Sequence, residues 1–456
     1  MSPPTRRVVA TAVAVLLVAG ACGNSESGGS GGGGGGDGAT PTTAEDGGAG
    51  ERDTFVESDQ PGVSDDEIAF DVVGTKANNP LGICILDCYA DGIRAYFAFR
   101  NSEGGIYGRQ LVLDEVVDDE LAQNQQRSLD VVSSDDAFGV FQATLLASGW
   151  GALDQAGVPT YAWGIHATEA AHRPSIFPST VVRCADCPRP MVPWVAKQEG
   201  ATKAASLGYG ATENSKVCAQ MVAESFRRHE EASGVEMVYE KDDLQYGLPN
   251  GIGPEVTAMK DAGVDFISTC IDLNGMKSLA QELDRQGMTD VTLYHPNSYD
   301  HTFISEGGEL FEGDVVTVQL RPFEVDAGGS TMEDYRRWMD EIGREPSELS
   351  MVGWINASTA FDGLLAAGPE FDRQKVIDAT NALEGYTAGG LIRELDWGTA
   401  HTPFTAADPR PDRPECSALV RVEGGRFVPY GDPSTPWVCW DSWDTDQTEP
   451  TLRDFG

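Results

Sequence analysis

Cysteine spacing is the clearest sign of chemistry in this sequence, which contains nine cysteines. Setting Cys22 aside leaves an even number, and an even number in an exported chain favours disulfides. Eight cysteines allow many pairings, so any connectivity is a hypothesis. We expect two local pairs and two pairs that close longer loops: Cys84 with Cys88, Cys184 with Cys187, Cys218 with Cys270, and Cys416 with Cys439.

The Cys184-Ala-Asp-Cys187 segment also has the spacing of a redox or zinc half-site. A redox role needs a thioredoxin-like βαβ context, which the flanking arginines and prolines do not provide. A zinc site needs two more ligands at suitable spacing, and no second CxxC follows. We therefore expect a structural staple, placed where the chain crosses between two parts of the fold.

Catalytic motifs do not support an enzyme. The sequence has no HExxH zinc motif and no G-x-x-x-x-G-K-[ST] phosphate loop. His295 and His301 flank one predicted loop, and we expect solvated loop histidines rather than a metal pair. We expect no catalytic residue, metal or cofactor.

Charge excludes one class of partner. Lys and Arg number 32 against 72 Asp and Glu, which gives a formal net charge of −40. So acidic a surface repels phosphate backbones and argues against nucleic-acid binding. With 40% hydrophobic residues, most of the chain is expected to fold.

The N-terminus predicts export. Arg6 and Arg7 precede an apolar run over residues 8–20, which is too short to cross a bilayer and is typical of a secretory signal. The end of this run resembles a bacterial lipoprotein signal, in which small residues precede a cysteine that is lipidated. Residues 1–22 are thus a predicted signal peptide with Cys22 as the lipidation site, ordinary secretion being the alternative. Residues 23–64 are rich in Gly and predict a flexible tether.

Strand and helix patterns alternate from residue 65 onward. Tyr89, Ile93, Tyr96 and Phe97 share one helical face between β-branched runs at 68–73 and 111–117. A second series begins near residue 203, with predicted strands at 204–209, 235–239, 264–269 and 291–294. Helical patterns at 332–342, 351–367 and 373–383 and a hairpin around Gly424-Gly425 follow. Two such series predict an α/β protein with two doubly wound parallel-sheet lobes.

Residues 101–109, Asn-Ser-Glu-Gly-Gly-Ile-Tyr-Gly-Arg, resemble the N-x-x-GG-I-x-G-R segment of branched-chain amino-acid-type periplasmic binding proteins. Asp118-Asp119 after the next strand, the helix over 351–365 and the hairpin over 420–428 resemble that family as well. The resemblance implies a type I periplasmic-binding-protein fold, with two lobes joined by a hinge and a ligand between them. Lobe 1 would comprise 65–183 and 321–396, and lobe 2 would comprise 184–320 and 397–456. We interpret the glycines of the motif as turn residues that do not touch ligand.

Ligand contacts are predicted at strand ends, because ligands of open parallel sheets bind outside the carboxyl ends of the strands. Asp272 could pair with an ammonium group, and Trp163 or Tyr299 could stack on an apolar or cationic one. The family often has a Ser/Ala–Thr-like pair after its fourth strand, whereas Ala162-Trp163-Gly164 stands here, which argues against an ordinary α-amino acid. The predicted ligand residues are Gln142, Thr144, Trp163, Gly164, Tyr209, Asn214, Asp272, Asn297 and Tyr299.

The resemblance implies an exported, lipid-anchored, monomeric binding protein. It would capture a small polar molecule, such as an amino acid, an amide or a related compound, and deliver it to the permease and ATPase subunits of an ABC importer. The same fold could instead serve a membrane receptor as a ligand sensor, and an exported hydrolase is the least favoured alternative.

Overall fold

The architecture described here is that of a computed structural model. It describes residues 52–79, 83–181, 184, 186–211, 213–296, 298–325, 331–402, 414–443 and 446–456. The predicted signal peptide with Cys22, the tether up to residue 51 and Asn297 lie outside these residues.

A five-stranded parallel sheet forms the first lobe, in the order β2-β1-β3-β4-β5. Its strands are short apolar runs rich in Val, Ile and Phe, which suit a sheet buried on both faces. The elements of this part are β1 (Glu67–Gly74), α2 (Leu86–Ser102), β2 (Gln110–Asp118), α3 (Asn124–Ser134), β3 (Gly139–Ala143), α4 (Trp150–Gln155), β4 (Thr160–Ala162), α5 (Ala167–Ala170) and β5 (Ile176–Pro178).

The second sheet begins with the same strand order, β7-β6-β8-β9-β10, and these strands are parallel. Antiparallel strands β11, β13 and β14 then extend it, and β12 pairs with β11. The second sheet is therefore mixed, whereas the sequence predicted a parallel one. Its elements before β11 are α6 (Met191–Gln198), β6 (Lys203–Tyr209), α7 (Glu213–Arg228), α8 (Glu230–Ser233), β7 (Glu236–Leu244), α9 (Gly253–Ala262), β8 (Phe266–Cys270), α10 (Leu273–Gln286), β9 (Thr292–His295), α11 (His301–Gly307), η1 (Gly308–Phe311) and β10 (Val315–Val318).

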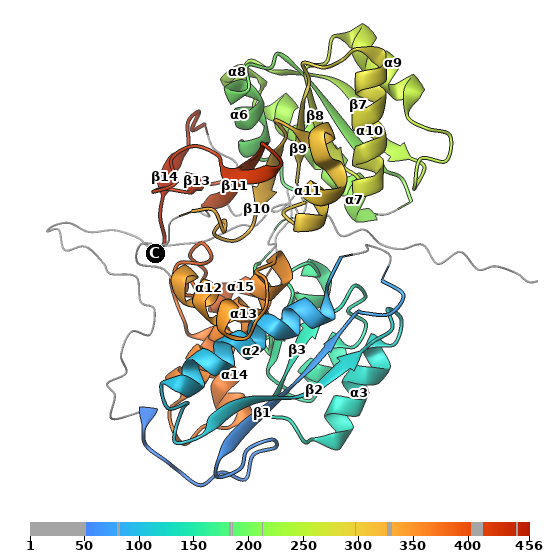
Figure 1. Ribbon diagram of the computed structural model, residues 1–456. Coiled ribbons are helices and arrows are strands. Elements are labelled where there is room, and N and C mark those ends of the chain that lie inside the picture. The colour runs from blue at the N-terminus through green and yellow to red at the C-terminus, as the bar shows by residue number, and fades with distance from the viewer. Residues whose placement is uncertain are drawn as a thin grey trace, which may run out of the picture.

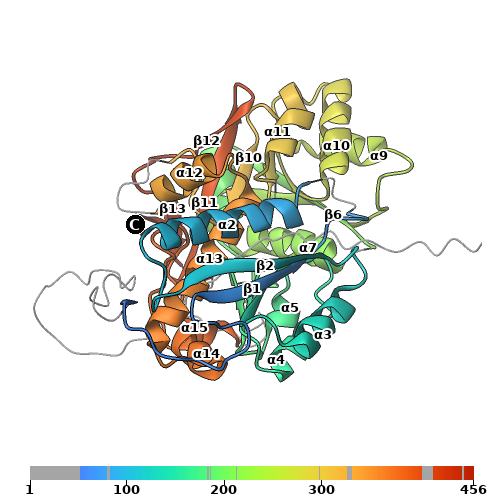
Figure 2. The ribbon, with the colours of Figure 1, turned by 60° about the horizontal axis from the view of Figure 1, so that its bottom comes forward.

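The remaining elements return to the first lobe and then to the second. Helix α13 packs along α2, and Figures 1 and 2 both show the two helices side by side. The aromatic ring of Trp397 lies 5.3 Å from that of Phe177 on β5, so α15 packs with the first lobe, whereas the second lobe was predicted to begin at residue 397. These elements are α12 (Met332–Glu341), α13 (Glu348–Ala367), α14 (Arg373–Asn381), α15 (Trp397–Ala400), β11 (Glu415–Glu423), β12 (Arg426–Pro429), β13 (Trp437–Trp440) and β14 (Thr451–Arg453).

The chain connects the lobes three times, between β5 and α6, between β10 and α12, and between α15 and β11, and we call these connections the first, second and third crossovers. Their described residues are 179–181, 184 and 186–190 in the first, 319–325 and 331 in the second, and 401, 402 and 414 in the third. The first leaves from the carboxyl end of β5 and the second from the carboxyl end of β10. Because β5 and β10 run parallel to their neighbours, the carboxyl ends of both parallel sheets point toward the other lobe. Figure 1 shows the two lobes one above the other, with this junction between them.

Close contact between α2 and α13 depends on glycine. A Cβ on Gly353 would lie 2.1 Å from the carbonyl oxygen of Tyr89, and a Cβ on Gly92 would lie 1.8 Å from that of Ser350. The Tyr89 hydroxyl donates to the carbonyl of Tyr161 on β4 (3.1 Å) and accepts from the Asn356 amide on α13 (2.6 Å). This packing fixes the position of β4, which carries a predicted ligand segment at its end.

We expect Gly353→Ala to lower the free energy of unfolding by about 2 kcal/mol, because one of two rigid helices must move to admit the methyl group. Urea denaturation measures the change. Gly151→Ala on α4 is the matched control, since its new Cβ would be 3.5 Å from the nearest atom, on Arg173, and it should stabilise by up to about 1 kcal/mol. A loss no greater in Gly353→Ala than in Gly151→Ala would contradict the proposed clash.

The Asn101–Arg109 motif forms the turn between α2 and β2, as the sequence predicts. Gly104, Gly105 and Gly108 all have positive φ, and a Cβ on Gly105 would lie 2.0 Å from the Arg109 carbonyl oxygen. The buried Arg109 donates from Nη2 to the carbonyl of Val56 (2.8 Å). Part of the predicted tether, residues 52–64, therefore packs against the first lobe, because the motif supplies donors for its backbone carbonyls.

Four disulfides join the cysteines in the predicted pairs: Cys84–Cys88, Cys184–Cys187, Cys218–Cys270 and Cys416–Cys439. Among the described residues, no helix has both the length and the apolar character needed to cross a bilayer.

Candidate functional site

The second lobe brings two predicted ligand residues together. In the strand order β7-β6-β8-β9-β10 the connections reverse direction between β6 and β8, and such a switch point opens a crevice at the carboxyl ends. Tyr209 ends β6, and Asp272 follows β8. The Tyr209 hydroxyl donates to Asp272 Oδ1 over 2.9 Å. These two side chains therefore form a polar pair at this switch point, in which Tyr209 has no exposed surface and Asp272 is half-buried.

Asp272 has a structural role beside any role in binding. It is the N-cap of α10, and its Oδ1 also accepts from the backbone N–H of Gly275 (2.7 Å). Its Oδ2 takes part in neither bond. Such a cap fixes the carboxylate in place through Oδ1.

Tyr246 completes this group and was not predicted from the sequence. Its ring lies 5.2 Å from that of Tyr209 and is 41% exposed. Burial, followed by the charge of Asp272, raises the pKa of both Tyr209 and Tyr246, so both hydroxyls are protonated at neutral pH. The predicted strand ended at residue 239, but β7 continues to Leu244 through a charged, half-exposed stretch that hid its end.

Ser215 and a disulfide hold the two strand ends in register. The Ser215 hydroxyl accepts from the backbone N–H of Tyr209 (2.7 Å) and donates to the carbonyl of Cys270. Cys270 is bonded to Cys218 on α7. Asn214 also lies on α7, but its side chain is outside the description.

The first lobe has its own switch point, between β1 and β3, and here the predicted residue Thr144 is already engaged. Its hydroxyl donates to Asp119 Oδ2, and the side chain is fully buried. The Thr75 hydroxyl accepts a hydrogen bond from the backbone N–H of Leu145 (3.0 Å). Thr144 therefore ties β3 to the loop after β2, which leaves it poorly placed to bind a ligand directly.

Gln142 points into the first lobe. Its Oε1 accepts from Asn124 Nδ2 (2.9 Å) and from Trp150 Nε1 (3.3 Å), and the residue has no exposed surface. Side chains alternate along a strand, so a residue near a strand end need not face the ligand side. In this geometry Gln142 supports α3 and α4 instead of reaching the space between the lobes.

Trp163 and Gly164 follow β4 as predicted. Trp163 is partly exposed and packs at the edge of the main core, with its backbone N–H bonded to the carbonyl of Gln142 (2.8 Å). Gly164 must lack a side chain, because a Cβ would lie 2.4 Å from the Thr180 carbonyl oxygen. A crevice of about 10 Å³ beside Gly164 has room for roughly one water.

His166 lies next to this segment and is uncharged. Its Nε2 is 2.8 Å from the Thr144 carbonyl oxygen, and burial lowers its pKa. None of the first-lobe residues named here thus carries a positive charge at neutral pH, which leaves an anionic ligand without a cationic partner among them.

Tyr299 belongs to a different neighbourhood. It is buried, its hydroxyl donates to Glu324 Oε2 (2.6 Å), and its ring packs on Phe323 and Phe427. Burial, with the charge of Glu324, raises the pKa of Tyr299. Its partners come from the second crossover and β12, so it links the lobe to the hinge. Asn297, two residues earlier, lies outside the described residues.

A hydrogen-bonded chain of Thr269, His295 and Asp314 has the residue types of a hydrolytic triad. His295 Nδ1 lies 2.6 Å from Thr269 Oγ1, and Nε2 lies 2.8 Å from Asp314 Oδ2. All three side chains are buried. Burial raises the pKa of Asp314, although the hydrogen bond with His295 acts to lower it. The chain ties β8 and β9 to the residue before β10. The expectation that His295 is a solvated loop residue was wrong, because it closes β9 inside the lobe.

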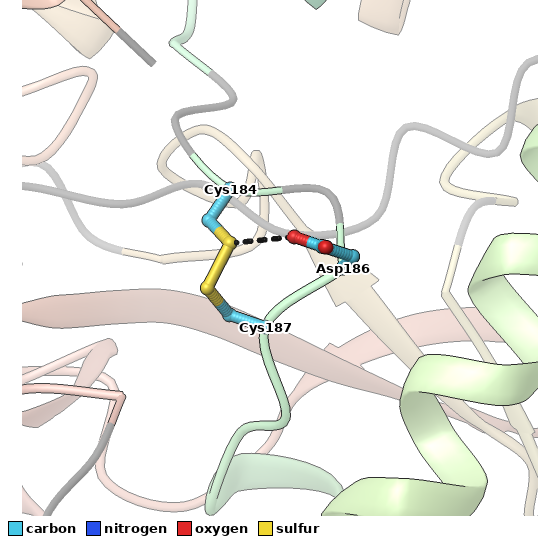
Figure 3. Close-up of side chains that lie close together, drawn as sticks. All are labelled: Cys184, Asp186 and Cys187. Atoms are coloured by element: carbon cyan, nitrogen blue, oxygen red, sulfur yellow. Dashed lines mark hydrogen bonds between the residues drawn. A yellow bond between two sulfur atoms is a disulfide. The ribbon is translucent and has the colours of Figure 1, made fainter. Parts of the chain in front are cut away.

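Figure 3 shows the Cys184–Asp186–Cys187 group, with Asp186 Oδ1 3.1 Å from Cys184 Sγ. The two sulfur atoms are bonded to each other, so neither is a thiolate that could bind zinc or act as a redox nucleophile. The group lies in the first crossover, as the staple interpretation predicts.

Two larger hollows lie on other parts of the surface. One of about 520 Å³ is lined by residues of α2, α12 and α13, and one of about 550 Å³ by residues around α10 and η1. Neither contains a predicted ligand residue. The strand-end pair Tyr209–Asp272, with Tyr246 beside it and Trp163 on the opposite lobe, remains the best-built candidate site.

Comparison with known proteins gives a consistent family and fold. A family model described as periplasmic binding protein matches residues 85–426. Among solved structures, the chain is similar to a solute-binding protein of an R. palustris ABC transporter in complex with 4-hydroxybenzoate, with 17% identity, a TM-score of 0.61 and coverage of 83% of this chain and 98% of that one. It is similar to a branched-chain amino acid ABC transporter protein from Thermus thermophilus with bound valine, with 15% identity, a TM-score of 0.60 and coverage of 85% and 97%. It is also similar to a protein from Rhodospirillum rubrum that is described as a putative branched-chain amino acid ABC transporter. The identity is 18%, the TM-score is 0.60, and the match covers 80% of this chain and 99% of that one. No curated protein matches the chain.

Proposed function

Since the chain belongs to the periplasmic binding protein family, we propose that it is the solute-binding component of an ABC importer and captures a small molecule between its lobes. Two lobes joined by three crossovers, with the carboxyl ends of their parallel strands facing each other, suit this role. A ligand that contacts both lobes stabilises the closed arrangement by its differential affinity for it.

The ligand class follows from the Tyr209–Asp272 pair, which is the observation that carries the proposal. A capped carboxylate with the exposed ring of Tyr246 beside it suits an ammonium or other cationic nitrogen, because that ring face and the carboxylate both attract positive charge, while the buried Tyr209 holds the carboxylate in place. The formal net charge of −40 also favours the approach of cations over anions.

The first lobe contributes Trp163 in place of a hydroxyl pair. A partly exposed indole can stack on a flat or apolar portion of a ligand. We therefore infer an organic cation or a zwitterion with a flat or apolar portion, rather than a simple carboxylic acid.

Export and anchoring form part of the same proposal. The N-terminal signal and Cys22 favour a mature protein held at the outer face of the membrane by lipid, with permease and ATPase subunits as partners. Incorporation of labelled fatty acid in the wild type but not in Cys22→Ala tests the anchor.

A thermal-shift screen tests the binding function. The panel contains organic amines, amino acids, amides and aromatic carboxylates, each with the mature protein. At 100 times its dissociation constant a ligand stabilises the protein by about 2.7 kcal/mol, which gives a clear shift. We expect shifts from amines or zwitterions. Shifts from aromatic carboxylates alone would contradict the ligand class, and chemical conversion of a compound would indicate an enzyme instead.

We expect Trp163→Ala to weaken binding of the best compound of the panel about tenfold, and Trp163→Phe to retain most of the affinity, because a phenyl ring still offers a π-face. Isothermal titration calorimetry measures both. Equal affinity in the wild type and Trp163→Ala would remove Trp163 from the site.

A further inference from the structure

The segment after β12 is a feature that the binding function leaves unexplained. It lies beyond residue 426, where the family match ends, and it contributes Trp437, Trp440 and Trp443 to the buried part of the protein. We call residues 437–443 and 446–456 of this segment the brace.

The brace contacts the first crossover in two ways. The buried ring of Trp443 packs with the Cys184–Cys187 disulfide, which lies in that crossover and is drawn in Figure 3. Glu449 then accepts from Lys197 Nζ (2.8 Å) and Trp194 Nε1 (3.0 Å) of α6, the helix that the crossover enters.

The brace contacts the second crossover through an ion pair. Arg321 lies in that crossover and is 1% exposed. Its Nη1 and Nη2 donate to the two carboxylate oxygens of Asp454, over 2.5 and 3.1 Å. Such a bidentate pair fixes orientation as well as distance. Partial burial acts to raise the pKa of Asp454, but the bond and charge of Arg321 outweigh it and hold the pKa below its usual value.

The same arginine reaches the first lobe. Its backbone N–H donates to the carbonyl of Leu391 (2.7 Å), and Nη1 approaches that of Gly390 (3.4 Å). Arg321 thus lies between a first-lobe loop and Asp454, so any rotation of the lobes about the second crossover must move this contact.

The strand that follows the third crossover is joined covalently to the brace. This strand is β11, whose Cys416 is bonded to Cys439 of β13, and Glu415 pairs with Trp440 in the same ladder. Phe455 returns to pack its ring 5.5 Å from that of Trp437, so both ends of the brace are tied to one another.

From these contacts we propose that the brace holds the described ends of all three crossovers in one unit and so limits how far the two lobes open. Hinges work by concentrating backbone rotation in a few residues, and tying those residues to a common strand pair removes part of their freedom. A narrower range of open arrangements also lowers the ordering cost of closure.

Asp454→Asn tests the proposal in the full mature chain without any ligand. Ser133 on α3 and Asp284 on α10 are both exposed, and each is replaced by a spin-labelled residue other than cysteine. The four disulfides therefore remain intact. Figure 1 shows both helices on the side of the molecule away from β13 and β14, where opening changes their separation most. We expect the interlobe distance distribution from electron–electron double resonance to broaden about twofold.

Asp441→Asn is the matched control, because Asp441 is an exposed aspartate of the same brace, and its distribution should stay as in the wild type. A second variant that lacks residues 451–456 loses β14, Asp454 and Phe455 together, and should broaden the distribution at least as much. Circular dichroism confirms that each variant is folded. Unchanged widths in both folded variants would overturn the proposal, and this result is independent of which ligand binds.

Discussion

Asp272→Asn should weaken binding of the best amine or zwitterion about 100-fold, a loss of about 2.7 kcal/mol, while the protein stays folded. The carboxylate is expected to face the cationic nitrogen through Oδ2, and an amide removes that charge. The side-chain oxygen of Asn can still accept from the backbone N–H of Gly275 and cap α10, because Asn caps helices about as well as Asp.

The choice of Asn over Ala matters for this experiment. Asp272→Ala would also remove the cap, which costs about 1 kcal/mol of stability, and would leave the Tyr209 hydroxyl without its acceptor. A loss of affinity in the alanine variant would then mix two causes.

Asp300→Asn provides the control for Asp272→Asn. Asp300 also follows a second-lobe strand and also caps a helix, accepting from the Thr302 backbone N–H (2.7 Å), but it lacks the tyrosine pair. Calorimetric titration of both variants with the same compound separates a local charge effect from a general one. If the two variants bind equally well, the ligand does not sit on Asp272.

Removal of the Cys218–Cys270 disulfide should lower the free energy of unfolding by about 4 kcal/mol in the double variant Cys218→Ala/Cys270→Ala. The bond joins residues 52 positions apart, so it removes much of the freedom of the unfolded chain. It also connects α7 to the end of β8, beside Ser215 and Tyr209, so weaker ligand binding should accompany the lower stability.

The Cys84–Cys88 bond supplies the comparison, since its cysteines are only four positions apart. Chain entropy predicts a loss of about 2 kcal/mol for Cys84→Ala/Cys88→Ala. Urea denaturation of the three proteins under the same conditions measures both losses. Equal losses would show that loop length does not account for the stabilisation.

Helices and central strands were predictable because burial imposes a period on the sequence. Tyr89, Ile93, Tyr96 and Phe97 follow one helical face and are all buried on α2. The runs at 68–73 and 111–117 became β1 and β2 with small changes at their ends. A buried face needs apolar residues at regular intervals wherever its partner lies, so this information is local.

Short or half-exposed strands were harder to predict. β5 has only three residues, and β10 and β13 have four each, so none of them gives a periodic signal. β7 carries charged residues near its end, which shortened the predicted strand and hid Tyr246. The antiparallel extension of the second sheet depends on which distant strand pairs with β11, and no local pattern encodes that choice.

The sequence by itself indicated the family, the two α/β lobes and the disulfide pairs, and it predicted strand ends at which a ligand would bind, since each of these depends on residue type and spacing along the chain. Only the tertiary structure decided which partner each of these side chains has: it joined Tyr209 to Asp272 and Tyr246, turned Gln142 and Thr144 to partners inside the first lobe, and brought Asp454 to Arg321. The physical reason is that side-chain direction and pairing depend on neighbours that the fold supplies from far along the chain.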